Sequence, residues 1–133
     1  MARNGFAFAD VARATFFLAL AATPVRGADC DVAAGGRLFQ EQQCAGCHTF
    51  AADDLEKSGP NLHGVVGRAA ASGPFNFYSD QLKRSGLVWT PEALKKWLTN
   101  PSALVPGTSM PFLGLNDDDD RNTLVCYIEQ KSR

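Results

Sequence analysis

Two cysteines and a histidine lie within five residues of one another, early in the chain. Cys44 and Cys47 are three positions apart, and His48 follows directly. At this spacing two thiols lie about one helical turn apart on one face, where both can form thioether bonds to one macrocycle while the imidazole binds its iron. Cys-x-x-Cys-His is the attachment sequence for a c-type haem. The motif therefore predicts one haem c, bound through Cys44 and Cys47, that carries the chemistry.

Two other kinds of site use a similar pair of cysteines. A Cys-x-x-Cys pair can be a redox-active dithiol, and it can be half of a zinc site. The first normally lies among alternating strands and helices, and the second needs another closely spaced Cys/His pair. The sequence shows neither feature, and both alternatives leave His48 without a role. Haem attachment is therefore the favoured interpretation.

A second axial ligand for the iron must come from elsewhere in the chain, and Met110 is the candidate. It lies in the segment 105–112, which Pro106 and Pro111 stiffen, and the only other methionine is the initiator. A lone methionine can simply fill a core. Beside a haem motif, however, a thioether ligand paired with an imidazole is a known arrangement that raises the reduction potential. Iron with both axial positions filled favours electron transfer over catalysis.

Helices joined by long turns are expected to position these residues, because the sequence shows no strand-like alternation and no internal repeat. The expected helices cover residues 32–43, 79–85 and 90–100, and a last one opens at 117–120. Thr90, Pro91 and Glu92 form a helix start, with an N-cap residue, a first-turn proline and an acidic group. We interpret the four aspartates 117–120 in the same way, in preference to a metal or partner site.

Apolar residues recur at helical spacing in the two longer C-terminal helices. They are Leu94, Trp97 and Leu98 in the first, and Leu124, Tyr127 and Ile128 in the second. The segment 49–73 between the haem motif and these helices is rich in glycine and is expected to be a loop. Its apolar residues Leu62, Val65 and Val66 are expected to pack onto the cofactor.

The first 27 residues are predicted to be a cleaved signal peptide, which leaves a single domain at residues 28–133. Arg3 and Arg13 supply positive charge, residues 14–23 are apolar, and small residues surround Gly27. The apolar part is too short to span a bilayer. Export to the bacterial periplasm is the expectation, and an uncleaved membrane anchor is the alternative.

Charge argues against a nucleic-acid partner. From residue 28 onward the chain has 10 basic and 13 acidic residues, a net charge of about −3. The two carboxylates of a haem would make the protein more negative. Nucleic-acid binding requires a basic surface, so this class of function is not supported.

Several further motifs accompany the haem motif and Met110. They are the segments 59–64 (GPNLHG), 67–68 (GR), 78–79 (YS), 89–90 (WT), 100–101 (NP) and 106–110 (PGTSM). With them, residues 35–128 resemble the class I (monohaem) c-type cytochromes, of the bacterial kind that is similar to mitochondrial cytochrome c. The resemblance implies an all-α fold, in which short helices and long loops wrap around one covalently attached haem. It also implies that the N- and C-terminal helices cross, with Gly35 and Phe39 against Leu124 and Tyr127.

The same resemblance assigns roles to individual residues. The Pro60 carbonyl is expected to accept a hydrogen bond from the second nitrogen of His48 and so fix the ring. Four residues are expected around the haem propionates, because buried carboxylates need donors; they are Arg68, Tyr78, Ser79 and Trp89. Phe112 is expected to shield the haem near Met110, and Trp97 and Thr108 complete the predicted cofactor-binding residues.

The chain also departs from the mitochondrial pattern. Trp97 stands where a tyrosine usually reaches the methionine sulfur, and Leu82 replaces an asparagine near the propionates. Ser102, Ala103 and Ser109 replace lysines that ring the haem edge, so we expect association with partners to depend only weakly on salt. Four residues instead of three separate Phe39 from Cys44, which implies a bulge or an extra turn there.

Two cysteines remain outside the haem motif, Cys30 and Cys126. In an oxidising compartment an even pair favours a disulfide, and the crossing of the first and last helices would bring the two residues together. The alternative is that Cys126 is a small buried apolar residue and Cys30 a free thiol. The bridge is the preferred prediction.

The predicted function is that of a soluble, monomeric, periplasmic one-electron carrier that meets donor and acceptor redox proteins in transient complexes. Two alternatives stay open at this point. One is a haem peroxidase or gas-binding sensor in which Met110 leaves the iron, and the other is an electron-transfer subunit anchored by an uncleaved leader.

Overall fold

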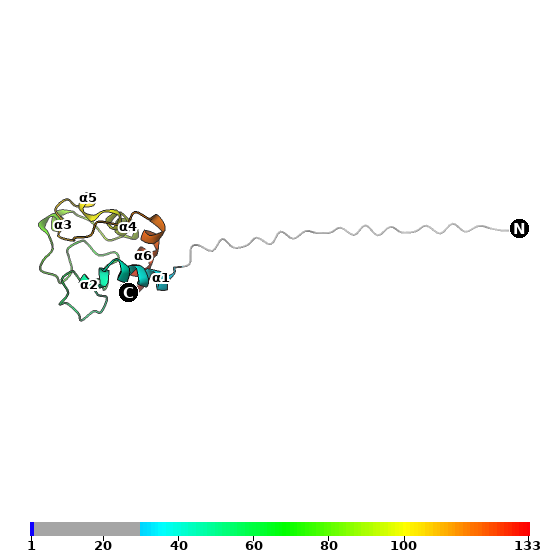
Figure 1. Cartoon of the computed structure of the whole chain (residues 1–133), viewed down its shortest axis with the longest axis horizontal. Coiled ribbons are helices and arrows are strands. Elements are labelled where there is room, and N and C mark those ends of the chain that lie inside the picture. The colour runs from blue at the N-terminus through cyan, green and yellow to red at the C-terminus, as the bar shows by residue number, and fades with distance from the viewer. Residues whose placement is uncertain (2–29) are drawn as a thin grey trace.

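The computed structural model describes residues 30–133 together with Met1 (Figure 1). The predicted signal peptide, residues 1–27, lies outside the described residues apart from Met1. Within the described part the regular structure is helical, and the only β pairing is an isolated antiparallel bridge between Ala69 and Val88. The all-α prediction is therefore confirmed. No helix in residues 30–133 has both the length and the apolar character to cross a membrane.

Residues 30–133 form six helices joined by loops, of which the longest runs from the haem motif to residue 79. The helices are α1 (Val32–Glu41), α2 (Cys44–Cys47), α3 (Asp80–Arg84), α4 (Pro91–Thr99), α5 (Pro101–Leu104) and α6 (Asp118–Lys131). All except α2 begin in the same way, with a side-chain oxygen that accepts a hydrogen bond from a backbone N–H three residues later. The capping residues are Asp31, Ser79, Thr90, Asn100 and Asp117. The aspartate run 117–120 is thus a helix start, as predicted.

Two helix boundaries differ from the sequence prediction. The first helix ends at Glu41, and Gln43 then adopts a left-handed conformation with φ 58°, which turns the chain before α2. This turn accommodates the extra residue between Phe39 and Cys44. Asn100 ends α4 as predicted, but its side chain also caps α5, a single helical turn for which there was no sequence prediction.

Helices α1 and α6 cross, with Gly35 at the closest point. A Cβ atom on Gly35 would overlap the Cβ of Tyr127 and would lie only 2.8 Å from the Thr123 carbonyl oxygen. Phe39, one turn later, is buried and packs its ring 5.5 Å from that of Tyr127. The expected crossing of the N- and C-terminal helices is confirmed, and it depends on a residue without a side chain at the contact.

A disulfide joins Cys30 to Cys126 and ties the chain before α1 to the middle of α6. The two residues are 96 positions apart in sequence, and their Cα atoms are 5.8 Å apart. The preferred prediction for this pair is confirmed. Cys44 and Cys47 are the free cysteines of the described chain.

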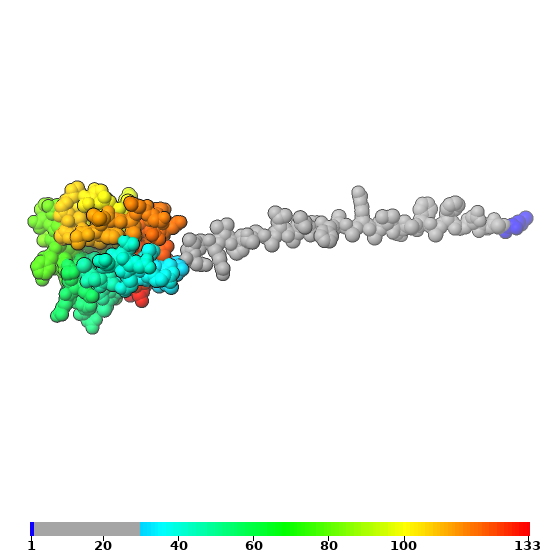
Figure 2. All heavy atoms as spheres, viewed as in Figure 1, coloured from blue at the N-terminus to red at the C-terminus, as the bar shows by residue number. Residues whose placement is uncertain are grey.

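The core lies between α6, α4 and the loops, with Leu124 fully buried at its centre. Leu94, Trp97 and Leu98 of α4 and Ile128 of α6 are buried around it, as their spacing predicted. Figure 2 shows α5 and the segment between α5 and α6, in yellow and orange, on one side of the molecule. The cyan α1 and the green loop after the haem motif form the other side.

Candidate cofactor site

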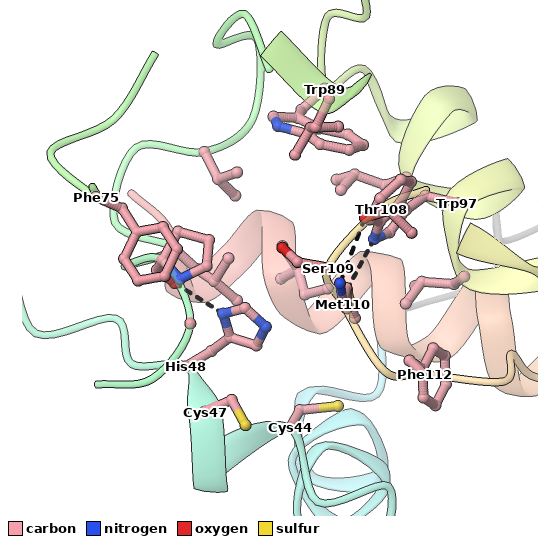
Figure 3. A pocket seen from close by; sticks show the side chains of 18 of the residues that line it. Cys44, Cys47, His48, Phe75, Trp89, Trp97, Thr108, Ser109, Met110 and Phe112 are labelled. Atoms are coloured by element: carbon pink, nitrogen blue, oxygen red, sulfur yellow. Dashed lines mark hydrogen bonds between the residues drawn. The ribbon is translucent and has the colours of Figure 1, made fainter. Parts of the chain in front are cut away.

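A cavity of about 410 Å³ opens in the middle of the described fold, and the haem motif lies against it (Figure 3). This volume falls in the range usual for ligand and cofactor sites. Its walls are mainly apolar and come from every helix except α5 and from the loops between them. The aliphatic side chains of the lining, together with Phe39, are Leu62, Val65, Leu82, Leu94, Leu98, Leu124 and Ile128. Several of the predicted core residues therefore also form a binding surface.

The thiols of Cys44 and Cys47 line this cavity from the single turn of α2. Both cysteines are free and half-buried. Burial raises the pKa of the Cys44 thiol, an effect that a backbone hydrogen bond partly opposes. No cluster of three or more potential His, Cys, Asp or Glu metal ligands occurs among residues 30–133, so a zinc site finds no support there.

The His48 ring is fixed by a hydrogen bond to the Pro60 carbonyl oxygen, 2.7 Å from Nδ1. A carbonyl can only accept, so Nδ1 carries the hydrogen and Nε2 keeps its lone pair. Burial lowers the pKa of His48 and favours this neutral form, although the bond to Pro60 acts in the opposite direction. Gly59 lets the loop pass close by, since a Cβ there would lie 2.7 Å from the His48 ring. The hydrogen bond that the resemblance implied for His48 and Pro60 is present.

Met110 lines the same cavity from the loop that follows α5. Its sulfur accepts a hydrogen bond from the indole Nε1 of Trp97, at 3.2 Å. Its backbone N–H donates to the Thr108 hydroxyl at 3.4 Å. Figure 3 shows His48 and Met110 in one cavity. His48 is hydrogen-bonded to Pro60 and Met110 to Trp97, so separate parts of the chain hold the two side chains.

Most of the other predicted cofactor-binding residues also line the cavity. These are Pro60, Arg68, Tyr78, Trp89, Trp97, Thr108 and Phe112. Ser79 does not belong to the lining; its hydroxyl accepts a hydrogen bond from the Leu82 N–H and caps α3. The cap confirms the helix that the sequence predicts to begin at residue 79, whereas Ser79 is absent from the residues that line the cavity.

Polar groups gather on the side of the cavity formed by the long loop. The Arg68 guanidinium donates to the carbonyl oxygens of Asn61 and His63, which hold it in place. Burial raises the pKa of the Tyr78 phenol, and the nearby Arg68 charge partly offsets this effect. Tyr78 thus remains a neutral O–H donor near a positive charge. Such a pair suits a ligand that carries carboxylates within an otherwise apolar site.

Two aromatic residues of the lining, Phe75 and Phe77, were not among the predicted site residues. Phe75 packs edge-on against both neighbours, with its ring centroid 5.1 Å from that of Tyr78 and 5.7 Å from that of Phe77. Phe77 lines the cavity although 78% of its surface is exposed. A cluster of three aromatics directly after Gly73 and Pro74, within a loop, was the signal that could have identified them.

The residues present fit a haem. The cavity offers two free thiols one turn apart, a neutral imidazole, a thioether, and apolar walls that suit the macrocycle. Arg68, Tyr78 and Trp89 line the same cavity and carry N–H or O–H donors that would suit the propionates. This donor set matches a covalently bound haem better than a dithiol redox site, which would leave His48, Met110 and the cavity unexplained.

Comparisons with known proteins agree with this donor set. The family profile described as Cytochrome c matches residues 32–132. The cytochrome c of Cochliobolus lunatus is 40% identical over 103 residues, which are 77% of this chain and 94% of that protein. The cytochrome c of Theileria annulata is 42% identical over 102 residues, 77% of this chain and 87% of that protein. Among solved structures, cytochrome cH from Methylobacterium extorquens is similar with a TM-score of 0.67 and 40% identity, covering 75% of this chain and 98% of that one.

Proposed function

Because the chain belongs to the cytochrome c family, whose members are haem-containing electron carriers, we propose that it is a soluble one-electron carrier of the bacterial periplasm. In this proposal His48 and Met110 would both bind the iron of one haem c, which Cys44 and Cys47 would hold covalently. The haem supplies a reversible one-electron change at its iron when bound. The protein supplies its position, its axial ligands and a dry surrounding.

One observation carries the proposal: the only methionine of residues 30–133 and the histidine of the haem motif line one cavity, and both are held by hydrogen bonds. Neutral imidazole and thioether are the ligand pair that favours the reduced iron and a raised potential. With both residues bound to it, the iron would have no position left for a substrate. The arrangement therefore favours a carrier over an enzyme.

The other lining residues would prepare the site for electron transfer without large movement. Apolar side chains such as Leu94, Leu98 and Phe112 exclude water, which stabilises the less charged form of the cofactor. Arg68, Tyr78 and Trp89 would donate to the propionates, so that two carboxylates are tolerated beside an apolar cavity.

Two features support a periplasmic protein. The predicted signal peptide at residues 1–27 implies export, and a disulfide between Cys30 and Cys126 is of the kind that persists in oxidising compartments. The expected partners are donor and acceptor redox proteins that bind briefly, with the carrier itself a monomer. The net negative charge supports no nucleic-acid role.

Absorption spectra of the purified holoprotein test the ligand set. The oxidised wild type should show the weak long-wavelength band that methionine ligation gives in this family, and the reduced protein should not bind carbon monoxide readily. Met110→Ala should lose the band and bind carbon monoxide. Met110→His offers a matched control, because it removes the band but can keep the sixth position filled.

Two results would overturn the proposal. Rapid carbon monoxide binding by the reduced wild type, together with peroxide turnover, would favour a haem peroxidase or gas sensor. Recovery of the mature protein only in the membrane fraction, with its leader intact by mass spectrometry, would favour an anchored subunit.

A further inference from the structure

The helix α1 has cysteines beyond both of its ends, and they are in two different chemical states. Cys30, two residues before its start, is bridged to Cys126 of α6. Cys44, three residues after its end, and Cys47 are free thiols that line the cofactor cavity. Figure 3 shows both of these thiols beside His48. The chain therefore has to oxidise one pair of thiols while it keeps the other pair reduced for the haem.

In the unfolded chain, Cys30 is much closer in sequence to the haem cysteines than to its native partner. It precedes Cys44 by 14 residues and Cys47 by 17, whereas 96 residues separate it from Cys126. The probability that two residues of a flexible chain meet falls with about the 3/2 power of their separation, so Cys30 meets Cys44 about 18 times as often as Cys126. A bridge to Cys44 or Cys47 would block haem attachment, because thioether bonds need free thiols.

Cys30 reaches Cys126 only where α1 crosses α6, and there the two Cα atoms are 5.8 Å apart, a usual distance for a disulfide. The same crossing places Phe39 of α1 and Leu124 and Ile128 of α6 in the cavity wall, where all three are buried. Without a group that fills the 410 Å³ beside them, these side chains lose packing contacts on one side. That loss is large compared with the marginal stability of a small domain. The crossing that pairs the two cysteines therefore depends on the haem.

We propose that haem attachment precedes the disulfide between Cys30 and Cys126 and directs its formation. The thiols of Cys44 and Cys47 each add to one vinyl group. The sulfur bonds to one vinyl carbon, the hydrogen goes to the other, and the C=C bond becomes single, so this step needs no oxidant. Cys30 and Cys126 are then the only thiols left in the chain. They pass two electrons and two protons to a disulfide-bonded oxidant, whose own bridge becomes two thiols.

This order removes both competing thiols before the remaining pair is oxidised, so a single disulfide can form. The inference rests on covalent attachment of the haem and not on the carrier function. None of its tests measures electron transfer, so its failure leaves the carrier function unaffected, and loss of methionine ligation in the absorption spectrum leaves this inference unaffected.

Intact-mass spectrometry of the exported full chain tests the order. Newly made protein is pulse-labelled in bacteria that attach haem, and samples are quenched with iodoacetamide, which adds a fixed mass to each free thiol. We expect a transient species that has gained haem and has two alkylated cysteines, Cys30 and Cys126, before the bridged holoprotein accumulates. A haem-free species with Cys30 already bridged to Cys126, which then gains haem, would overturn the proposal.

A reoxidation experiment tests whether the haem directs the pairing. Holoprotein whose bridge has been reduced is compared with the haem-free Cys44→Ala/Cys47→Ala chain, in which no other thiol competes, and both are exposed to glutathione disulfide. The bridge should re-form at least tenfold faster in the holoprotein, because only there do the packed helices hold Cys30 near Cys126. Equal rates would show that α1 and α6 cross without the haem, and the proposal would fail.

The haem-free wild type shows the competing reaction in the same oxidant. Peptide mapping should find Cys30 bridged mainly to Cys44 or Cys47, with less than about 10% bridged to Cys126. A majority of the native bridge in this sample would contradict the proposal.

Cys30→Ser/Cys126→Ala is the matched variant for haem attachment, because it removes the bridge and leaves the haem motif unchanged. It should gain haem in cells at least as fast as the wild type, since attachment does not need the bridge. Slower gain of haem in this variant would mean that the bridge forms first.

Discussion

The indole of Trp97 donates a hydrogen bond to the sulfur of Met110, with 3.2 Å between Nε1 and Sδ. Trp97 is buried in α4 and packs edge-on against Trp89, their ring centroids 5.1 Å apart, so the donor is held firmly. A tyrosine hydroxyl is expected at this place by resemblance to the mitochondrial proteins. The structure shows that the larger indole reaches the same acceptor.

Trp97→Phe is expected to lower the reduction potential. A donor on the sulfur withdraws electron density from the thioether and favours reduced iron, so its loss stabilises the oxidised state. A hydrogen bond that is about 1 kcal/mol stronger in the reduced protein than in the oxidised protein raises the potential of a one-electron couple by roughly 40 mV. We therefore expect the potential to fall by about 20–60 mV in the variant. Potentiometric titration measures it. Trp97→Tyr, which keeps a donor, should change the potential less, and an unchanged or higher potential in Trp97→Phe would contradict this role.

Gly35→Ala is expected to destabilise the protein by about 1–3 kcal/mol, because the added methyl group would overlap Tyr127 at the crossing of α1 and α6. Denaturant unfolding measures the change. Gly36→Ala is the matched control, since a Cβ there would lie 3.3 Å from the Tyr127 ring edge and would gain helix propensity of up to about 1 kcal/mol. Equal effects of the two substitutions would show that the crossing does not depend on Gly35.

Removal of the disulfide is expected to lower stability through the entropy of the unfolded chain. Closing a loop with a sequence separation of 96 residues corresponds to about 4–5 kcal/mol in the loop-closure treatment. Cys30→Ser/Cys126→Ala should therefore shift the denaturation midpoint strongly without changing the absorption spectrum. Comparison with Cys30→Ser alone separates the bridge from the packing of Cys126, because the two variants should be similarly unstable if the bridge dominates.

Asp118 is expected to contribute to the loss of stability in acid. Hydrogen bonds from Arg121 and from Lys95 hold its pKa below the usual value, with ion-pair distances of 2.8 Å and 3.3 Å. An aspartate whose pKa is lower in the folded protein than in the unfolded chain stabilises the fold at every pH above its unfolded pKa of about 3.9. This contribution is lost as the pH falls through the lower pKa of the folded state.

The measurement is the free energy of unfolding from pH 6 down to pH 2. Asp118→Asn should lose less stability over this range than the wild type, because it has no such contribution to lose. Asp119→Asn removes the same charge from the next residue, which forms no ion pair in the described chain, and should follow the wild type. A wild-type slope in Asp118→Asn would show that the ion pairs to α4 and within α6 do not affect folding. The effect is small because the carboxylate is exposed.

Much of the site could be predicted because its information is local in sequence. Cys44, Cys47 and His48 are adjacent, and Met110 is the only methionine of residues 28–133. Thr90 and Asp117 each cap the helix that begins at the next residue. Short-range hydrogen bonds and helical spacing are enough to establish such features. The single turn α5 was not predicted, because Asn100 is both the C-cap of α4 and the N-cap of α5. A residue that ends one helix is not normally expected to begin the next.

Other features depend on residues that only folding brings together. Whether Cys30 meets Cys126, whether the Trp97 indole reaches the Met110 sulfur, and which aromatic side chains line the cavity are decided by distances between separate elements. Ser79 shows both cases, because the helix that begins there follows from local sequence, while its absence from the cavity lining is decided by the tertiary structure. The sequence by itself determined the cofactor, the helical class and the candidate ligands, since these follow from residue type and spacing. Tertiary structure alone decided the orientation of those ligands and which side chains line the cavity around them, because packing between separate elements sets both.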